Sequence, residues 1–345
     1  MTADPLCDAL AVADARAVFS GGFTAGGSWA IRLHGPDRLK VNAVVRGSCL
    51  LMREDGGEPV RLVAGDVVVS DGARPYVLGS APGVSPLGSG QVPVDGARMA
   101  RLGSGGGVGG GDGDGDDDEV TCLAGHVDLS RDHGGLLRSA LPELVHVRGE
   151  AAEAPALQWL IRQLLDEMAG GRAGADFAAD HLAQLIFVQV LRICLVEADA
   201  LPAGWLRALA DERLAPVLRL MHGEPGRPWR LDELARAAAM SRTGFAVRFR
   251  EVVGVPPLAY LAGWRMGLAA RALRLEAAPV AAVARSVGYA SESAFSTAFK
   301  RALGVSPRGY RNATHPTFGS PPHVAEVNGI SLVSGSVPGG RSGAG

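Results

Sequence analysis

A short pattern that occurs twice in the last third of this sequence, about fifty residues apart, constrains its fold more than any other feature. In the first copy, residues 231–241 have Leu and Ala at helical spacing, with acids in the first turn and Ser241 placed to cap the next helix. Residues 242–252 then place Phe245 and Phe249 on one face. A short helix, a tight turn and a second helix predict a helix-turn-helix unit.

The second copy follows the same order. Residues 280–287 form its first helix, Gly288 suits a left-handed helix end, and Ser291 caps the next helix. Phe295 and Phe299 are its buried pair. The chain is therefore predicted to contain two helix-turn-helix units.

The segment between the two units, residues 258–276, is predicted to be one helix. Its ~19 residues span roughly 28 Å at 1.5 Å per residue. Successive major-groove faces of a DNA duplex are roughly 34 to 36 Å apart. A rigid spacer of this length could present both second helices to one side of a duplex.

The faces opposite the phenylalanines are the candidate DNA-binding surface. Arg and Lys neutralise phosphates, whereas Thr, Ser and Val can read base edges or a thymine methyl group. The phenylalanines themselves are predicted to pack in the core. A face that is merely solvated is the alternative interpretation. The predicted DNA-binding residues are Arg242, Thr243, Ala246, Val247, Arg250, Glu292, Ser293, Ser296, Thr297 and Lys300.

The basic residues are concentrated in the same part of the chain. The whole chain of 345 residues has a net charge of −2, but residues 216–312 carry fifteen Arg or Lys against six acids, a net charge of +9. The remaining residues therefore carry −11. Nucleic acid is the usual partner of a compact basic domain, although a solvated face or anionic lipid is also compatible with it.

The amino-terminal part has a different pattern, with short β-type runs separated by Gly, Pro and Asp. This spacing favours an antiparallel sandwich or barrel over alternating β-α units. Residues 103–119 are almost entirely Gly and Asp, which predicts a disordered insert because such a segment buries no apolar surface. The predicted strands are residues 29–33, 40–45, 49–53, 60–63, 66–70 and 121–127.

Two amphipathic patterns follow the predicted barrel. Apolar residues recur at spacings of three and four over residues 157–168, and Gly170-Gly171 ends this helix. Residues 177–196 are apolar on more than one side. They predict a helical hairpin that packs on its own domain or, alternatively, forms a dimerisation surface. Residues 313–345, rich in Gly, Ser and Pro, are predicted to be a disordered tail.

Motifs along the basic segment resemble those of a known family. They are Trp229, Leu234-Ala235, Met240-Ser241-Arg242, Pro257, Tyr260-Leu261, Trp264-Arg265-Met266, Val287-Gly288-Tyr289, Gly304-Val305-Ser306-Pro307 and Tyr310-Arg311. With the phenylalanine pairs, they make residues 216–311 resemble the DNA-binding domain of AraC/XylS-type transcription regulators. One departure is Ala239, where the family often has Gly; a left-handed backbone there would cost Ala on the order of 1 kcal/mol.

The amino-terminal part resembles the cupin-like domain of a subgroup of these regulators. The resemblance rests on Arg46-Gly47-Ser48-Cys49 and Ala64-Gly65-Asp66-Val67-Val68, with further likeness at residues 136–142 and 202–206. It implies a barrel that senses a small molecule, or dimerises the protein, and so changes how the DNA-binding domains are presented.

Nothing in the sequence predicts catalysis, a metal or a cofactor. Enzymes that share this barrel hold a metal with clustered His and an acid, but no His cluster lies near Asn42, Asp71 or Tyr76, and His34 stands alone. The Gly-rich run at 103–115 lacks the Lys-Ser/Thr ending of a phosphate-binding loop. A cupin-type metalloenzyme tethered to DNA is the rival interpretation.

The four cysteines are Cys7, Cys49, Cys122 and Cys194, with no CxxC spacing. This usage predicts reduced, buried thiols, with a redox sensor as the alternative. No signal-peptide pattern and no run of 18 uninterrupted apolar residues is present, which predicts a cytoplasmic protein with no membrane partner.

These observations predict an α+β protein of two domains. A cupin-like sensing domain spans residues 1–150, a helical hairpin and linker 151–207, and an all-α DNA-binding domain 208–312. The predicted function is sequence-specific regulation of transcription, without enzymatic activity. The expected partners are double-stranded DNA, a small-molecule effector of unknown identity, RNA polymerase and a second copy of the chain. A scaffold that binds DNA constitutively, without an effector, is a further alternative.

Overall fold

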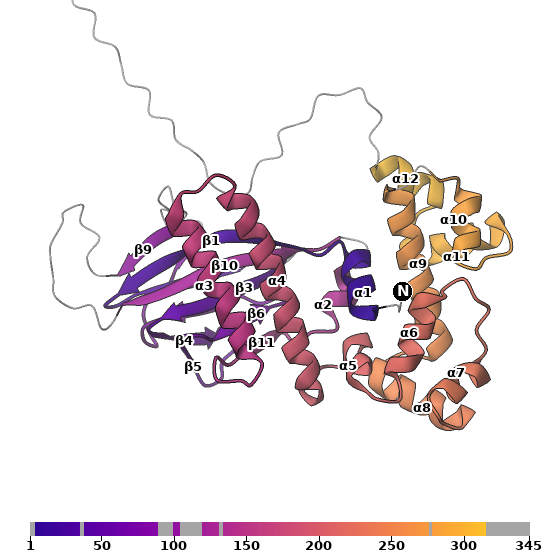
Figure 1. Ribbon diagram of the computed structural model, residues 1–345, viewed down its shortest axis with the longest axis horizontal. Coiled ribbons are helices and arrows are strands. Elements are labelled where there is room, and N and C mark those ends of the chain that lie inside the picture. The colour runs from indigo at the N-terminus through magenta and orange to yellow at the C-terminus, as the bar shows by residue number, and fades with distance from the viewer. Residues whose placement is uncertain are drawn as a thin grey trace, which may run out of the picture.

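The computed structural model describes residues 4–34, 38–88, 99–103, 119–130, 134–275 and 278–314. Figure 1 shows a β-rich part joined to a helical part, with a pair of long helices lying along the β-rich part. The predicted α+β fold class with two domains is confirmed. The Gly/Asp insert and the tail lie almost wholly outside the described residues.

Two sheets face each other in the β-rich part. The six-stranded sheet has the order β11 (Leu144–Val147), β6 (Val67–Ser70), β3 (Arg38–Arg46), β10 (Val120–Asp128), β1 (Arg16–Gly26), β9 (Met99–Gly103). The five-stranded sheet has the order β5 (Val60–Val63), β4 (Ser48–Arg53), β7 (Tyr76–Gly79), β2 (Ala30–Leu33), β8 (Leu87–Gly88). The pairing is antiparallel except for β1 with β9 and β2 with β8.

Strand alternation divides the side chains between two cores. In β6, Val68 faces the interior between the sheets, whereas Val67 and Val69 face the outer core beneath the helices. This period of two follows from the pleat of the strand. The interior is closed by large side chains such as Trp29 and Leu51.

Each predicted strand coincides with an observed one, but β7, β8, β9, β11 and the long strand β1 were not predicted. Its sequence contains Gly21 and Gly22, and its pairing with β10 shifts register between Phe19 and Gly21. Glycines and a bulge disrupt the strand signal, because both weaken regular pairing.

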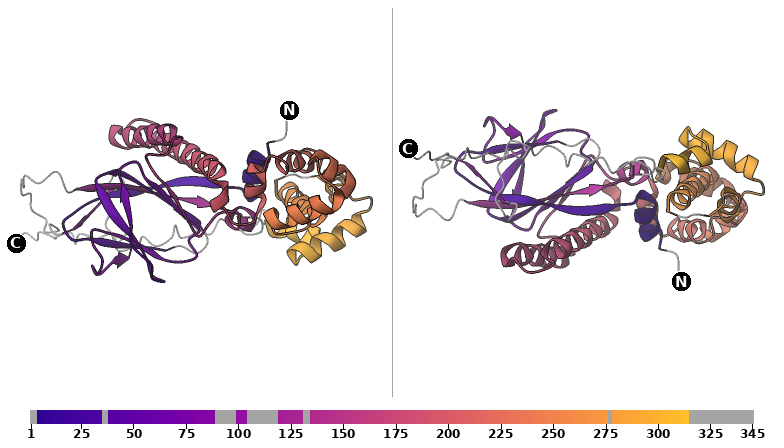
Figure 2. Two further views of the ribbon diagram at one scale, coloured as in Figure 1. Left: turned by 90° about the horizontal axis from the view of Figure 1, so that it is seen from below. Right: turned by 90° about the horizontal axis from the view of Figure 1, so that it is seen from above.

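The predicted hairpin consists of α3 (Ala154–Gly170) and α4 (Ala175–Val196), and α3 ends at Gly171 in the left-handed conformation. It covers the six-stranded sheet, as Figure 2 shows from two sides. Side chains of α4 satisfy the bulge of β1: Asp180 Oδ1 accepts from the Phe19 amide at 3.1 Å, and Gln184 Oε1 accepts from the Ala17 amide at 2.8 Å. These bonds fix the hairpin to the barrel.

Helix α4 alone among the helices of the described residues has the length and composition that could cross a membrane. Its contacts are those of a core helix, because it packs on β1, α3, α5 and β11. Its outer side nevertheless carries Phe177, Leu185 and Val196, all exposed.

The carboxy-terminal part consists of short helices around one long one. They are α6 (Ala215–Gly223), α7 (Leu231–Ala237), α8 (Arg242–Val253), α9 (Pro257–Leu275), α10 (Val280–Ser286), α11 (Glu292–Leu303) and α12 (Pro307–Thr314). The two predicted helix-turn-helix units are therefore present as α7–α8 and α10–α11, with the predicted spacer helix as α9.

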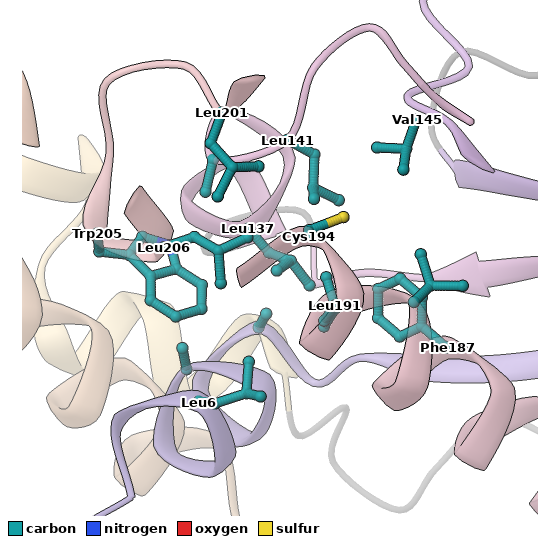
Figure 3. Close-up of a cluster of buried hydrophobic side chains, with 14 of the residues drawn as sticks. Leu6, Leu137, Leu141, Val145, Phe187, Leu191, Cys194, Leu201, Trp205 and Leu206 are labelled. Carbon is teal, nitrogen blue, oxygen red and sulfur yellow. The ribbon is translucent and has the colours of Figure 1, made fainter. Parts of the chain in front are cut away.

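A continuous core joins the barrel to the first helix-turn-helix unit. It includes α1 (Pro5–Ala13), α2 (Gly134–Arg138), the hairpin and α5 (Trp205–Ala210), which follows a single 3-10 turn (Ala198–Ala200). Figure 3 shows Leu6 of α1, Leu137 of α2 and Trp205 of α5 in one cluster of buried side chains. The Trp205 indole donates a hydrogen bond to the Leu136 carbonyl at 3.0 Å. The linker is thus a packed element.

Candidate nucleic-acid interface

The outward face of α8 is set by what the helix buries on its other side. Phe245 and Phe249 are fully buried and contact each other edge to face, with ring centroids 5.6 Å apart. The Ser241 hydroxyl accepts a hydrogen bond from the Gly244 amide at 3.2 Å, which confirms the predicted cap. These contacts fix both the rotation of α8 and its first turn.

The second unit repeats this arrangement. Phe295 and Phe299 are fully buried, with centroids 5.5 Å apart, and Phe299 also contacts Tyr310 of α12. Ser291 Oγ accepts from the Ala294 amide at 3.2 Å. The predicted core and cap residues of both units are confirmed.

The turns of both units pass through the left-handed region. Ala239 has φ +51° and Gly288 has φ +84°. Ala239 thus adopts the left-handed backbone that disfavours Ala, and this turn carries the strain of a side chain at positive φ. Gly288 has a second constraint, because an added Cβ would collide with the Gly226 carbonyl oxygen.

None of the predicted DNA-binding side chains of α8 is buried. Arg242, Thr243, Val247 and Arg250 are exposed, and Ala246 is half-buried. Val247 is 52% exposed, which is high for a large apolar side chain on a helix that buries its other face. The face is available for contact.

The corresponding face of α11 is also open. Ser293, Thr297 and Lys300 are exposed, while Glu292 and Ser296 are half-buried. The Thr297 hydroxyl donates to the Ser293 carbonyl at 3.0 Å, so its rotamer is set within the helix. This face is small and polar, with a cation in its last turn.

Ion pairs hold several charges at this surface. Arg242 pairs with Asp232 of α7 at 3.5 Å, and Glu292 pairs with Arg308 at 3.4 Å. Arg308, 81% exposed on α12, was not predicted as a site residue. The Ser306-Pro307 start of α12, where Ser306 Oγ accepts from the Gly309 amide, is the sequence signal that could have placed it beside α11.

Helix α9 belongs to both units. Tyr260, Leu261 and Trp264, in its first half, pack in the core of the first unit. Met266, Ala270 and Leu273, in its second half, pack in the core of the second. Because each half is packed, α9 fixes one unit relative to the other.

The barrel interior offers a different chemistry. Asn42 is buried, its Nδ2 donates to the Tyr76 hydroxyl at 2.5 Å, and its Oδ1 has no partner. Among the described residues, no group of three or more His, Cys, Asp or Glu is placed to hold a metal ion. Asn42 and Tyr76 are both neutral groups.

A barrel with a helical hairpin, followed by paired helix-turn-helix units on one spacer helix, defines a class of two-domain DNA-binding regulators. Family models agree with this class: one described as Cupin matches residues 4–196, and one described as Helix-turn-helix domain matches residues 234–313.

Curated relatives match along nearly the whole chain. A protein from Streptomyces antibioticus named "Putative AraC-like transcription regulator" is 39% identical over 91% of this chain and 99% of the relative. The "HTH-type transcriptional regulator AlkR" of Acinetobacter baylyi is 30% identical over 83% of this chain and 91% of the relative. A solved structure, the DNA-binding domain of AdpA in complex with a target DNA, is 34% identical over 31% of this chain and 99% of that chain, with a TM-score of 0.30.

This chain belongs to the AraC family of transcription regulators, with an amino-terminal cupin domain and a carboxy-terminal helix-turn-helix domain. It is a DNA-binding regulator of transcription, and its family is not one of enzymes.

Proposed function

We propose that this protein binds operator DNA in a sequence-specific manner by inserting α8 and α11 into neighbouring segments of the major groove. The observation that carries the proposal is the pair of capped helices, each with one buried and one open face, joined by a spacer helix packed into both units. Because its proposed target is DNA, the protein acts inside the cell.

The chemistry of the open faces suggests a role for each residue. Arg242, Arg250 and Lys300 contact phosphates and position the helices. Thr243 and Ser296 form hydrogen bonds with base edges, and Val247 contacts a thymine methyl group. Ala246 allows close approach, and Ser293 and Thr297 extend the polar contact. Glu292 accepts from a cytosine amino group once it leaves Arg308.

A titration of the intact protein against promoter fragments, followed by fluorescence anisotropy, tests this interface. We expect salt-sensitive binding that depends on sequence. Arg250→Ala and Lys300→Ala should weaken binding to all fragments, whereas Thr243→Ala and Ser296→Ala should change which fragment binds best. The matched control is Arg271→Ala, in the spacer helix. Binding that ignores both sequence and salt would reject the proposal.

We propose that the chain divides into a sensing domain at residues 1–150, a hairpin and linker at 151–207, and a DNA-binding domain at 208–312. The continuous core from barrel to first unit supports the idea that an event in the barrel changes how α8 is presented. An effector can act only if it has different affinities for the DNA-competent and incompetent states. Equal effector affinity with and without operator DNA would reject coupling.

Dimerisation is the second proposed role of this part. The hairpin exposes three large apolar side chains, Trp159 (54%), Phe177 (72%) and Leu185 (51%), and gathered exposed apolar side chains are typical of interaction sites. Sedimentation of the intact protein should show a dimer that Phe177→Glu with Leu185→Glu converts to a monomer. RNA polymerase stays a predicted partner, but we assign no surface of this chain to its binding.

A further inference from the structure

Two of the four cysteines meet inside the barrel. Cys49 is the second residue of β4 in one sheet, and Cys122 is the third residue of β10 in the other. Both belong to the core between the sheets, where Cys122 is fully buried and Cys49 is 3% exposed. Their thiols are hydrogen-bonded to each other.

The topology of the sheets brings these thiols together. Strand β3 pairs with β10, and Val44 lies opposite Cys122. The chain then turns at Gly47, whose φ is +72° and where an added Cβ would lie 2.7 Å from the Glu119 carbonyl oxygen at the start of β10. Strand β4 continues into the other sheet and carries Cys49 into the core that Cys122 also faces. The contact therefore depends on strand pairing and a tight turn.

The shared hydrogen bond makes the two thiols unequal. Donation by the Cys122 thiol lowers the pKa of Cys49, against the opposing effect of burial. The same bond, with burial, raises the pKa of Cys122 well above its usual value. Cys49 is thus the better nucleophile of the pair, since the thiolate is the reactive form, and it is also the less buried of the two.

The other two cysteines lack such a neighbour. The Cys7 thiol donates to Asp4 Oδ2 at 3.1 Å, and its exposed position is on α1. Cys194 is buried in α4, where desolvation raises its pKa to about 11. Neither has a thiol partner among the described residues.

We propose that Cys49 and Cys122 are a reversible oxidation site, which forms a disulfide between the two sheets when a hydroperoxide reaches the barrel. The Cys49 sulfur attacks one oxygen of hydrogen peroxide, the O–O bond breaks, and the released hydroxide takes up a proton to become water. This leaves a sulfenic acid on Cys49. The Cys122 sulfur, losing its proton, attacks the Cys49 sulfur, the S–O bond breaks, and the hydroxide leaves with that proton as water. Two thiols are oxidised by two electrons, and one peroxide is reduced to two waters.

The disulfide joins the five-stranded sheet to the six-stranded sheet, on which the hairpin rests. In the reducing interior of a cell such a bond is transient, and a dithiol reductant restores both thiols. The site does not depend on the proposed DNA interface, so thiol measurements can succeed or fail independently of it.

The test uses the full-length protein and its Cys7→Ser/Cys194→Ser variant, which retains only the proposed pair. After exposure to hydrogen peroxide, the protein is denatured and its free thiols are alkylated. We expect the variant to lose both alkylatable thiols together and to recover both with dithiothreitol, and peptide mapping to link residue 49 to residue 122. Two thiols that stay alkylatable, or a different linkage in the full-length protein, would overturn the proposal.

Single substitutions test the order of the steps. In Cys122→Ser, oxidation should stop at Cys49, where dimedone traps the sulfenic acid. In Cys49→Ser, Cys122 should stay reduced under the same conditions. A dimedone adduct on Cys122 but none on Cys49 would contradict the assigned roles.

Discussion

The two helix-turn-helix units have the same plan but different surroundings. The core of the first unit is continuous with the hairpin, α1 and α5, whereas the second unit has a core of its own. Helix α8 is also tied directly to both ends of α5: Arg248 pairs with Asp211 at 2.6 Å, and the Gly204 amide donates to the Val252 carbonyl at 2.9 Å. The first unit is thus an extension of the amino-terminal part.

The turns of the two helix-turn-helix units also differ. In the first unit, the left-handed residue, Ala239, lies two positions before the cap, Ser241; in the second, Gly288 lies three positions before Ser291. The first turn is shorter and carries a strained Ala, and the second is unstrained but tightly packed on Gly226. From this difference we expect the first unit to respond to changes in the barrel more than the second unit, whose core is separate.

Core substitutions should separate the units most clearly. Phe249→Ala and Phe299→Ala each create a cavity and should cost about 3–5 kcal/mol. We expect Phe299→Ala to melt the second unit in a separate, earlier transition, whereas Phe249→Ala lowers the main transition with the barrel. Calorimetry of both variants checks this. Identical single transitions in the two variants would contradict separate cores.

Exchanging the left-handed turn residues of the two units should change the stability of the protein in opposite directions. Gly288→Ala adds the cost of a left-handed Ala to a collision with the Gly226 carbonyl, together about 2–4 kcal/mol of destabilisation. Ala239→Gly relieves the left-handed strain but adds backbone entropy to the unfolded chain, for a net gain of about 0.5 kcal/mol. Urea denaturation measures both. A stabilised Gly288→Ala protein would refute the strain argument.

The first unit should also respond to pH through His222. This side chain is buried, stacks on Trp264 at 3.8 Å, and accepts from or donates to the Tyr260 hydroxyl at 2.8 Å; burial lowers its pKa to about 3. The unfolded chain binds a proton near pH 6.5, so stability falls as pH decreases from about 6.5 toward 3. From pH 7 to 5 this group should cost about 2 kcal/mol.

The matched variant for this pH effect is His222→Gln, which keeps a hydrogen-bonding side chain but does not titrate. Thermal melts of both proteins from pH 7 to 5 should show a smaller loss of stability in the variant. Equal pH dependence in the two proteins would exclude His222 as the cause.

The smallest expected effect comes from the Arg248–Asp211 pair. Asp211 is 10% exposed and Arg248 is 47% exposed, so solvent screening limits their coupling to about 0.5–1 kcal/mol. A double-mutant cycle with Arg248→Ala and Asp211→Ala measures it. A coupling energy of zero would show that packing and the Gly204–Val252 hydrogen bond join α8 to α5 without help from this ion pair.

The sequence predicted the helical units well because their signals are local. Caps at Ser241 and Ser291, the spaced phenylalanine pairs and the left-handed Gly288 each act within one or two turns of chain. The same periodicity predicted which faces of these helices are open to solvent. Their contacts with DNA stay a prediction.

What the sequence did not predict depends on contacts between distant residues. The bulged strand β1 is stabilised by Asp180 and Gln184, which lie on α4 more than 150 residues away. The meeting of Cys49 and Cys122 requires the strand order of both sheets. No local pattern encodes such pairings, because they arise only when the sheets assemble.

Hydroxyl-radical footprinting of the intact protein on an operator shows directly whether α8 and α11 bind DNA together. We expect two protected segments on one side of the duplex, about one helical turn apart. Arg250→Ala should weaken one segment and Lys300→Ala the other. A single protected segment that both variants weaken alike would contradict the claim that α8 and α11 occupy neighbouring grooves.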